Sequence, residues 1–340
     1  MRPVVIFFFI LSSSSIFTAD AIGQSALQAK VAGIAADAQG TVSVSCLLPG
    51  TALNCDLNPH NHPPMQSVFK FPLVLTVLHL ADTGKLLPAQ QPGEPISITL
   101  KRTVRFLPED RIPNAYSPLQ DRYPEANVDV PLRKLIQLAA GKSDNAASET
   151  LLRIIGGPSV VQDYVHSLGI TEFQLQNGEQ GLHRDPAAQY RNWIEPAAAV
   201  ELLERLASNP PLSPAANDFL VKTLTASKTG SKRLRAGLPR GTALAHKTGT
   251  SGERNGKAAA TNDIGLITLP DGRRLAVAVF VTDASAKEAI RNRVIARVAR
   301  AAYDEALHTY APDKARNSAN RPAMRKAGWG RPESSFNSLP

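Results

Sequence analysis

Apolar positions recur at helical spacing through much of the chain. Residues 25–38 predict a first helix, which ends at Gly40. Residues 67–85 are almost wholly apolar, which predicts a helix buried on all sides. Residues 100–230 are expected to be mostly helical, with the clearest runs at 130–142, 147–157 and 195–206.

Strand patterns lie toward the two ends of the chain. Residues 41–57 hold two short apolar runs around a Pro-Gly turn, which predicts a hairpin. Beyond residue 240 three strands are expected, and a Pro-Asp-Gly turn joins the last two; they cover residues 241–250, 263–274 and 275–283. A final helix is expected over 286–309, with apolar residues at helical spacing: Ile290, Val294, Val298 and Ala301.

This order of elements predicts an α+β fold. One antiparallel sheet would draw on both ends of the chain and be flanked by the terminal helices, with an all-helical domain inserted between the two parts. We expect an α/β domain from residues 22–65 and 233–310, an all-α domain from 66–232, and an active site between them. The stretch 172–193 predicts a long irregular loop, and loops of that length are usually functional or disordered.

The start of the chain predicts export. Residues 1–21 combine a basic start, a short apolar run and an Ala-x-Ala site, as in a signal peptide, so a secreted, periplasmic protein without a membrane anchor is expected.

The net charge is +9, and residues 311–340 hold six basic against two acidic residues. This tail has no apolar period, which predicts disorder. Nucleic acid is not an expected partner of an exported chain, and a passive tail is favoured over one that binds anionic lipid or cell-wall polymer.

Cys46 and Cys55 flank the turn of the predicted hairpin. A register that pairs them would place their sulfurs opposite one another, and an oxidising compartment then favours a disulfide. Two buried, unbonded thiols explain the sequence equally well. Neither number nor spacing of the cysteines indicates metal binding or thiol catalysis.

Three short motifs carry candidate chemistry, and the first is Ser67-x-x-Lys70. It opens the buried helix, where side chains three residues apart share a face. A serine hydroxyl needs a neighbouring base to act as a nucleophile, and a partly buried lysine can lose its proton to serve as one. The free N–H of Ser67 at a helix start would attract developing negative charge.

The second and third motifs each have an ordinary structural explanation. Ser143-Asp144-Asn145 precedes a helix, where serine and aspartate are common N-caps; alternatively Ser143 relays a proton and Asn145 binds an amide. Lys247-Thr248-Gly249 could be a solvated strand end, yet a lysine and small residues in a core strand also allow a ligand to approach closely. The N–H groups of Thr250 and Ser67 would then form a two-donor oxyanion hole.

The ordered set of these motifs is the signature of penicillin-recognising serine enzymes. Over residues 22–310 the chain resembles a class A serine β-lactamase, and within that class the PER/VEB-like extended-spectrum branch. The stretches that carry the resemblance are residues 65–70, 179–193 and 245–263.

The resemblance implies a role for each matching residue. Ser67 would be the acylated nucleophile and Lys70 its activating partner, Ser143 would pass a proton to the β-lactam nitrogen, and Asn145 would bind the acylamide side chain. The substrate carboxylate would be held by the third motif and its neighbour: Lys247, Thr248, Gly249 and Thr250. Arg233 matches a position where some members supply a further carboxylate-binding arginine, and Tyr116 matches an aromatic residue at the pocket mouth. No cofactor or metal is implied, and a monomer is the default expectation.

Residues 177–185 depart from the usual pattern of the class. Glu179 matches the base that activates water for deacylation, and whether it or Lys70 takes the first proton in acylation stays open. Asn177 stands where an arginine commonly forms a loop-locking salt bridge, so that bridge is expected to be absent. His183 replaces an asparagine that positions the hydrolytic water.

The predicted activity is β-lactam hydrolysis, of penicillins and cephalosporins and by branch resemblance of oxyimino-cephalosporins, which confers antibiotic resistance. The alternatives are a cell-wall D,D-peptidase or penicillin-binding protein, which lacks a base on the long loop, and a β-lactam sensor, which needs a membrane segment. A metallo-hydrolase built on His60-x-His62 is disfavoured, because no Asp-His follows and the flanking prolines favour a turn.

Overall fold

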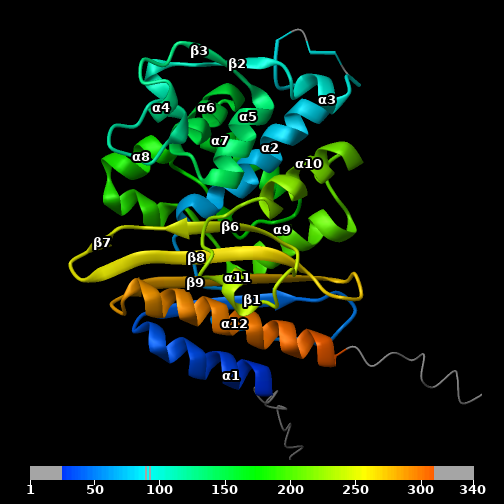
Figure 1. Ribbon diagram of the computed structural model, residues 1–340, viewed down its shortest axis with the longest axis vertical. Helices are drawn as coiled ribbons and strands as arrows, with labels where there is room; N and C mark the ends of the chain where they lie inside the picture. The colour runs from blue at the N-terminus through cyan, green and yellow to red at the C-terminus, as the bar shows by residue number, and fades with distance from the viewer. Residues whose placement is uncertain (1–24, 89, 92, 310–340) are drawn as a thin grey trace, which may run out of the picture.

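The structure is a computed structural model that describes residues 25–88, 90–91 and 93–309. The predicted signal peptide (1–21) and basic tail (311–340) lie outside the described residues. The main sheet is antiparallel and has the strand order β1-β9-β8-β6, with the short β7 beside β8. The bounds of these strands are β1 Thr41–Leu47, β6 Leu244–Thr250, β7 Glu253–Arg254, β8 Lys257–Thr268 and β9 Arg274–Ala284. The α+β fold expected from the sequence is therefore present, with a sheet built from both ends of the chain (Figure 1).

Both faces of the sheet are covered by helices. In β9, Leu275, Val277, Val279 and Val281 face α1 (Ala26–Ala35) and α12 (Glu288–His308), whereas Ala276, Ala278 and Phe280 face the helical part of the molecule. Successive side chains of a strand point to opposite faces, so burial on both faces requires the nearly continuous apolar run that the sequence shows. In Figure 1, α1 and α12 lie below the sheet and the other large helices lie above it.

The helical part is built around α2 (Lys70–Asp82), which follows a short 3₁₀ turn, η2 (Gln66–Phe69). Nearly every side chain of α2 is buried, as its apolar sequence predicts. A small two-stranded sheet lies at the far end of this part, with β2 at Thr103–Phe106 and β3 at Val128–Pro131. The other helices of this part are α3 Ile96–Thr99, α4 Pro118–Arg122, α5 Leu132–Ile136, α6 Asn145–Ile155, α7 Pro158–Ser167, α9 Pro196–Ser208 and α10 Pro214–Thr225. The short α11 (Leu234–Gly237) packs against α12 on the opposite face of the sheet.

The stretch 172–193 is not irregular, contrary to expectation. It contains β4 (Phe173–Gln174), the helix α8 (Glu179–Arg184) and the 3₁₀ helix η5 (Pro186–Arg191), and it closes where β5 (Trp193–Ile194) pairs with β4. The elements are too short to produce a recognisable period in the sequence. We call residues 172–194 the catalytic loop.

The predicted hairpin forms only in part. Val44 pairs with Leu57 in an isolated antiparallel bridge, with N···O distances of 2.7 and 3.1 Å, and no second strand of the predicted hairpin is formed within residues 48–57. The N–H of Asp56 donates to the Asn54 side chain instead of a strand neighbour, so local side-chain bonding competes with the ladder here.

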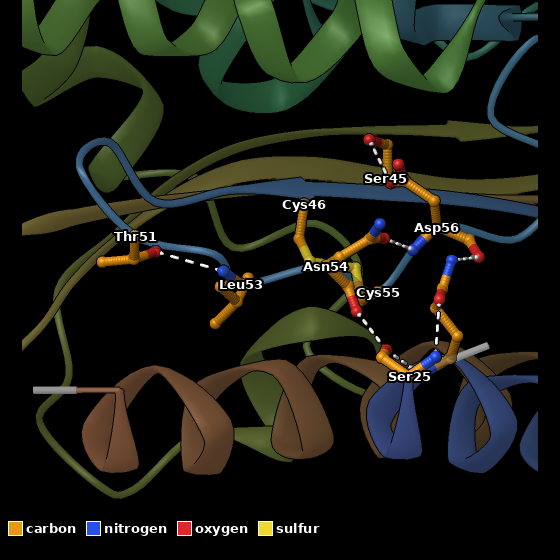
Figure 2. The surroundings of a disulfide bond; sticks show 9 residues. Ser25, Ser45, Cys46, Thr51, Leu53, Asn54, Cys55 and Asp56 are labelled. Atoms are coloured by element: carbon orange, nitrogen blue, oxygen red, sulfur yellow. Dashed lines mark hydrogen bonds between the residues drawn. A yellow bond between two sulfur atoms is a disulfide. The ribbon is translucent and has the colours of Figure 1, made fainter. Parts of the chain in front are cut away.

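Cys46 and Cys55 form a disulfide with a Cα–Cα distance of 5.7 Å, which decides between the two alternatives that the sequence left open. Their register is the one expected, since it is continuous with the Val44–Leu57 bridge. Figure 2 shows the bond between β1 and the segment that follows it, beside the start of α1. Ser45 supports the same segment by donating a 2.7 Å hydrogen bond to Asp56.

Candidate active site

The first motif lies at the junction of η2 and α2. Ser67 is half-buried within η2, and Lys70 is the first residue of α2 and fully buried. The Lys70 amino group donates to the Ser143 carbonyl at 2.8 Å and the Asn145 side-chain oxygen at 2.5 Å, and lies 2.9 Å from Glu179 Oε1. A buried ammonium needs such partners, and here all three come from predicted site residues.

Ser143 lies between the two lysines of the site. Its carbonyl accepts from Lys70, and its hydroxyl accepts a 2.9 Å hydrogen bond from Lys247 Nζ. The residue has a φ of 60°, a left-handed conformation that is strained for a serine. The turn that imposes this conformation aims both polar groups of Ser143 into the site.

Asp144 holds that turn in place. It is fully buried, caps α6 by accepting from Ala147 N, and accepts from the Ser117 hydroxyl at 2.6 Å and Leu119 N at 2.7 Å. The expected N-cap is therefore present, and the same carboxylate also anchors the segment that carries Tyr116. The backbone carbonyl of Tyr116 accepts a hydrogen bond from the Asn145 N–H, while the Tyr116 side chain is exposed.

Lys247 is buried within β6, the edge strand of the main sheet. Its amino group also donates to the Thr248 carbonyl at 2.8 Å. Burial holds the pKa of Lys247 well below its usual value, and the charge of Lys70 lowers it further, while Glu179 and Asp263 oppose the shift. The lysine is thus poised to share a proton with Ser143.

The residues around Lys247 are held by side chains far apart in sequence. The Thr248 hydroxyl donates to Thr229 at 2.9 Å. Arg233 is buried and donates to the Gly249 carbonyl, the Asn262 carbonyl, the Asn292 side chain and the Thr250 hydroxyl. Burial lowers the pKa of Arg233. Arg233 therefore braces β6 and orients Thr250, beyond the substrate contact that the sequence suggested.

Glu179 begins α8 inside the catalytic loop and is buried against α6. Its N–H donates to Glu149 Oε2 at 2.9 Å, and a Cβ on Gly178 would lie 2.7 Å from the same oxygen. Burial raises the pKa of Glu149; hydrogen bonds from Gln180 and Glu179 N–H groups oppose that rise. Glycine at 178 thus lets the loop approach α6 closely enough to place the Glu179 carboxylate beside Lys70.

Asn192 closes the neck of the loop. Its side-chain oxygen accepts from Gln176 N and Asn177 N at 2.9 and 3.0 Å, and its amide donates to the Asn177 carbonyl at 2.8 Å. An uncharged amide clamp thus spans the neck of the loop at Asn177.

A cavity of about 890 Å³ opens between the catalytic loop and the edge of the sheet. Four predicted residues line it, namely Asn145, Glu179, His183 and Thr250. His183 is exposed on α8, one turn beyond Glu179. Contacts join Lys70, Ser143, Asn145, Lys247 and Glu179 in one network, and Asn145 and Glu179 of that network reach the cavity. Ser67 does not line the cavity.

Comparisons with known proteins agree with this geometry. Residues 26–306 match the β-lactamase enzyme family. The chain is 38% identical to the extended-spectrum β-lactamase PER-1 of Pseudomonas aeruginosa, over 82% of this chain and 86% of the relative. It is 34% identical to β-lactamase VEB-1 of Pseudomonas aeruginosa, over 74% and 81%. The crystal structure of a β-lactamase from Chitinophaga pinensis DSM 2588 superposes with a TM-score of 0.77 at 38% identity, covering 83% of this chain and all of that one.

The chain belongs to the β-lactamase enzyme family. It is a class A serine β-lactamase, as the ordered motifs indicated, and its fold is that of the family. The reaction of such an enzyme is hydrolysis of the β-lactam amide.

Sequence reasoning missed the residues of this β-lactamase that hold the motifs in place. Glu149 and Asn192 position the catalytic loop, and Asn262 donates to the carbonyls of Pro64 and Met65 just before Ser67. A buried polar residue in an apolar strand is a signal for Asn262. Glu149 and Asn192 have no such signal, because they stand in ordinary helical and loop contexts.

Proposed function

We propose that this β-lactamase acts through an acyl-enzyme on Ser67, which water activated by Glu179 then hydrolyses. The observation that supports this proposal is the position of Lys70. Lys70 follows Ser67 in the chain by about one helical turn, and its amino group lies 2.9 Å from the Glu179 carboxylate. The two candidate bases, Lys70 and Glu179, are thus in direct contact in a buried network close in sequence to the proposed nucleophile. A D,D-peptidase would lack the loop carboxylate.

In acylation, the Ser67 hydroxyl attacks the β-lactam carbonyl and its proton passes to the Lys70–Glu179 pair. The N–H groups of Ser67 and Thr250 stabilise the resulting oxyanion. The Ser143 hydroxyl, held by Lys247 at 2.9 Å, then protonates the departing ring nitrogen. Lys247 passes a proton to Ser143 in turn, a role favoured by its depressed pKa, and the proton that the Lys70–Glu179 pair took from Ser67 restores Lys247 through Ser143, which lies between the two lysines.

Substrate recognition follows from the groups that remain free. Asn145 uses its side-chain oxygen to accept from Lys70, so its NH₂ group is available to donate to the substrate acylamide carbonyl. The substrate carboxylate is bound by Lys247, Thr248 and Thr250, on either side of Gly249 in β6. Arg233 donates to the Thr250 hydroxyl from behind the strand and adds positive charge there. Tyr116 forms the rim, and His183 shares with Glu179 the positioning of the hydrolytic water.

We also propose substrate range and location. The cavity of about 890 Å³ is roomy enough for the bulky side chain of an oxyimino-cephalosporin, so hydrolysis of these drugs and resistance to them are expected. The start of the chain and the Cys46–Cys55 disulfide support export to the periplasm, where the enzyme acts as a monomer. Among the residues that the structure describes, no helix has the length and apolar character needed to cross a membrane.

The test is a Glu179→Ala variant followed with a chromogenic cephalosporin. We expect a burst of about one equivalent and steady turnover lowered by about 10²–10⁴-fold, because acylation survives and general-base deacylation does not. The matched control is Ser67→Ala, which should abolish the burst as well. Turnover at the unaltered rate in Glu179→Ala would remove the glutamate from the mechanism.

A peptide ending in D-Ala-D-Ala separates this function from its main rival. The unmodified protein should leave it uncleaved while hydrolysing the cephalosporin. Comparable rates on both substrates would assign the chain to the peptidases instead.

A further inference from the structure

Two histidines outside the catalytic network lie against one glutamate. His60 Nδ1 is 2.7 Å from Glu195 Oε2, and His62 Nε2 is 3.4 Å from Glu195 Oε1. Glu195 is buried at the start of α9, whereas both histidines are exposed. The catalytic mechanism uses none of these three residues.

The imidazole rings are held in place by their surroundings. Prolines stand on both sides of the segment, at Pro59, Pro63 and Pro64, and restrict its backbone. His62 stacks on Trp193 with ring centroids 3.7 Å apart, and Trp193 is itself fixed by a 2.6 Å hydrogen bond to Gln174. The position of the His62 ring is thus set before any ligand binds.

A second carboxylate completes the cluster. Glu172 lies opposite Glu195 where the β4–β5 ladder begins, and the Glu195 N–H donates to the Glu172 carbonyl at 3.1 Å. Ligand atoms of His62, Glu172 and Glu195 all lie within 4.8 Å of one another. Two carboxylates directly across a ladder repel each other, so a cation between them would relieve that repulsion.

We propose that His62 Nε2 and the carboxylates of Glu172 and Glu195 form a binding site for a divalent transition metal, with Zn²⁺ as the best-suited ion. An imidazole nitrogen with carboxylate oxygens suits zinc, while calcium and magnesium prefer oxygen alone. His60 hydrogen-bonds to Glu195 and acts as the outer partner that orients this ligand. Water fills the remaining coordination positions, because the cluster is open to solvent on the histidine side.

The sequence could not reveal this site from His60-x-His62 alone. The expected turn is present, with the Asn61 N–H donating to the Asn58 carbonyl. The two carboxylates come from residues more than 100 positions further along, one at the start of the catalytic loop and the other directly after its end. The pairing of β4 with β5 brings the two carboxylates together, and the Pro64–Trp193 bridge and the Ala197 N–H to Pro59 carbonyl hydrogen bond bring the histidines to them.

The site joins two segments that the active site depends on. Pro64 bridges to Trp193, and Met65 N donates to the Asn192 carbonyl at 2.9 Å, so the segment leading to Ser67 already lies against the end of the catalytic loop. A metal held by His62 on one segment and by Glu172 and Glu195 on the other would tie them together. Its role is structural, and the chemistry on Ser67 does not require it.

The test is a calorimetric titration of tag-free, chelator-treated mature protein with ZnCl₂. We expect one Zn²⁺ per chain, no comparable binding of Ca²⁺, and a rise in Tm of at least about 2 °C at saturating zinc. Glu172→Gln and His62→Ala should each weaken binding at least about tenfold, and His60→Ala should weaken it by about 10–100-fold. Glu172 is exposed, so Glu172→Gln is the variant that leaves the fold intact.

The matched control is His308→Ala, which removes an exposed histidine near the end of α12. It should bind zinc as the unmodified protein does. The proposal is overturned by the lack of saturable zinc binding, by equal binding in Glu172→Gln, or by loss of binding in His308→Ala. Calcium binding as tight as zinc binding would overturn the choice of metal class.

Discussion

Gly249 shows how one residue can determine the distance between two parts of a site. It lies where β6 passes η2, and a Cβ there would overlap the Met65 carbonyl oxygen and lie 3.2 Å from a Val68 methyl. Its φ is not left-handed, so glycine is needed for close approach and not for an unusual backbone. The distance from Lys247 and Thr250 to Ser67 depends on that contact.

Gly249→Ala should therefore push β6 away from the nucleophile. We expect kcat/KM to fall by about 10²-fold, since a shift near 1 Å misaligns the reacting groups, with a loss of stability of about 1–3 kcal/mol. Steady-state kinetics and thermal melts measure both effects. Gly33→Ala, at a position with open space around a Cβ, is the control and should keep full activity. Unchanged kinetics in Gly249→Ala would show that the contact is not limiting.

Glu149 links the stability of the enzyme to pH. Burial raises its pKa in the folded state, so the folded chain keeps this proton at pH values where the unfolded chain has lost it. The stabilising contribution of the proton is complete below the unfolded pKa. It is lost as the pH rises through the folded pKa, where a buried charge must be accommodated.

Glu149→Gln should remove this dependence, because the amide keeps an oxygen for the Glu179 and Gln180 N–H groups but does not ionise. The Tm of the variant relative to the unmodified protein should rise between about pH 4.5 and neutrality. Calorimetric melts across that range give the comparison. A Tm difference that stays constant with pH would contradict the assignment.

At the scale of elements, the catalytic loop is a closed unit. The β4–β5 pair and the Asn192 clamp join its two ends, while Glu149 holds the start of α8. The loop carries Glu179 but neither Ser67 nor Lys70, so its position should affect deacylation more than acylation. The proposed deacylation base therefore lies on a different element from the proposed nucleophile.

Asn192→Ala should loosen the neck of the loop by leaving three backbone groups without their partner. We expect a stability loss of about 1–3 kcal/mol and a slower deacylation step, seen as a pre-steady-state burst with a chromogenic cephalosporin. Arg191→Ala is the neighbouring control, since its exposed ion pair with Asp185 contributes about 0–1 kcal/mol. Equal effects in both variants would argue against a specific clamp.

At the scale of the whole molecule, the active site lies where the helical part meets the sheet. Ser67, Lys70 and Ser143 come from the helical part, and Lys247 and Thr250 come from the edge strand. The disulfide belongs to the core on the opposite face of the sheet, with α1 and α12. The disulfide therefore stabilises the face of the sheet that does not carry the active site.

Replacing both Cys46 and Cys55 by serine should destabilise the protein without changing kcat/KM. Loss of a short cross-linked loop costs about 2–3 kcal/mol through the entropy of the unfolded chain. The expected fall in Tm is about 5 °C or more, measured by thermal melts, with the cephalosporin assay as the activity readout. Reduction of the unmodified protein should reproduce the shift. A variant that melts at the original temperature would deny the bond a stabilising role.

Much of this enzyme can be predicted from local sequence patterns. The buried helix expected at 67–85 is α2 (Lys70–Asp82), the last helix is α12, and the ordered motifs identify the chemistry. Three late strands are also present, but the middle one, β8, begins at Lys257, six residues before the predicted start. The structure of the catalytic loop is harder to predict from the sequence, because β4, α8, η5 and β5 are too short to show a recognisable period. Its glutamate was still found, since it stood in a pattern shared with the family.

The sequence by itself determined the fold class, the family and the residue types that do the chemistry, because these depend on periodicity and on short motifs along the chain. Tertiary structure alone decided which groups hold the catalytic residues in place: Glu149 at the start of α8, Asn192 across the loop neck and Asn262 at the Met65 carbonyl. It also alone placed the carboxylates of Glu172 and Glu195 beside His62. Hydrogen bonds and ion pairs depend on distances of about 3 Å in space. Residues that are far apart in the chain reach such distances only after the sheet and helices have packed.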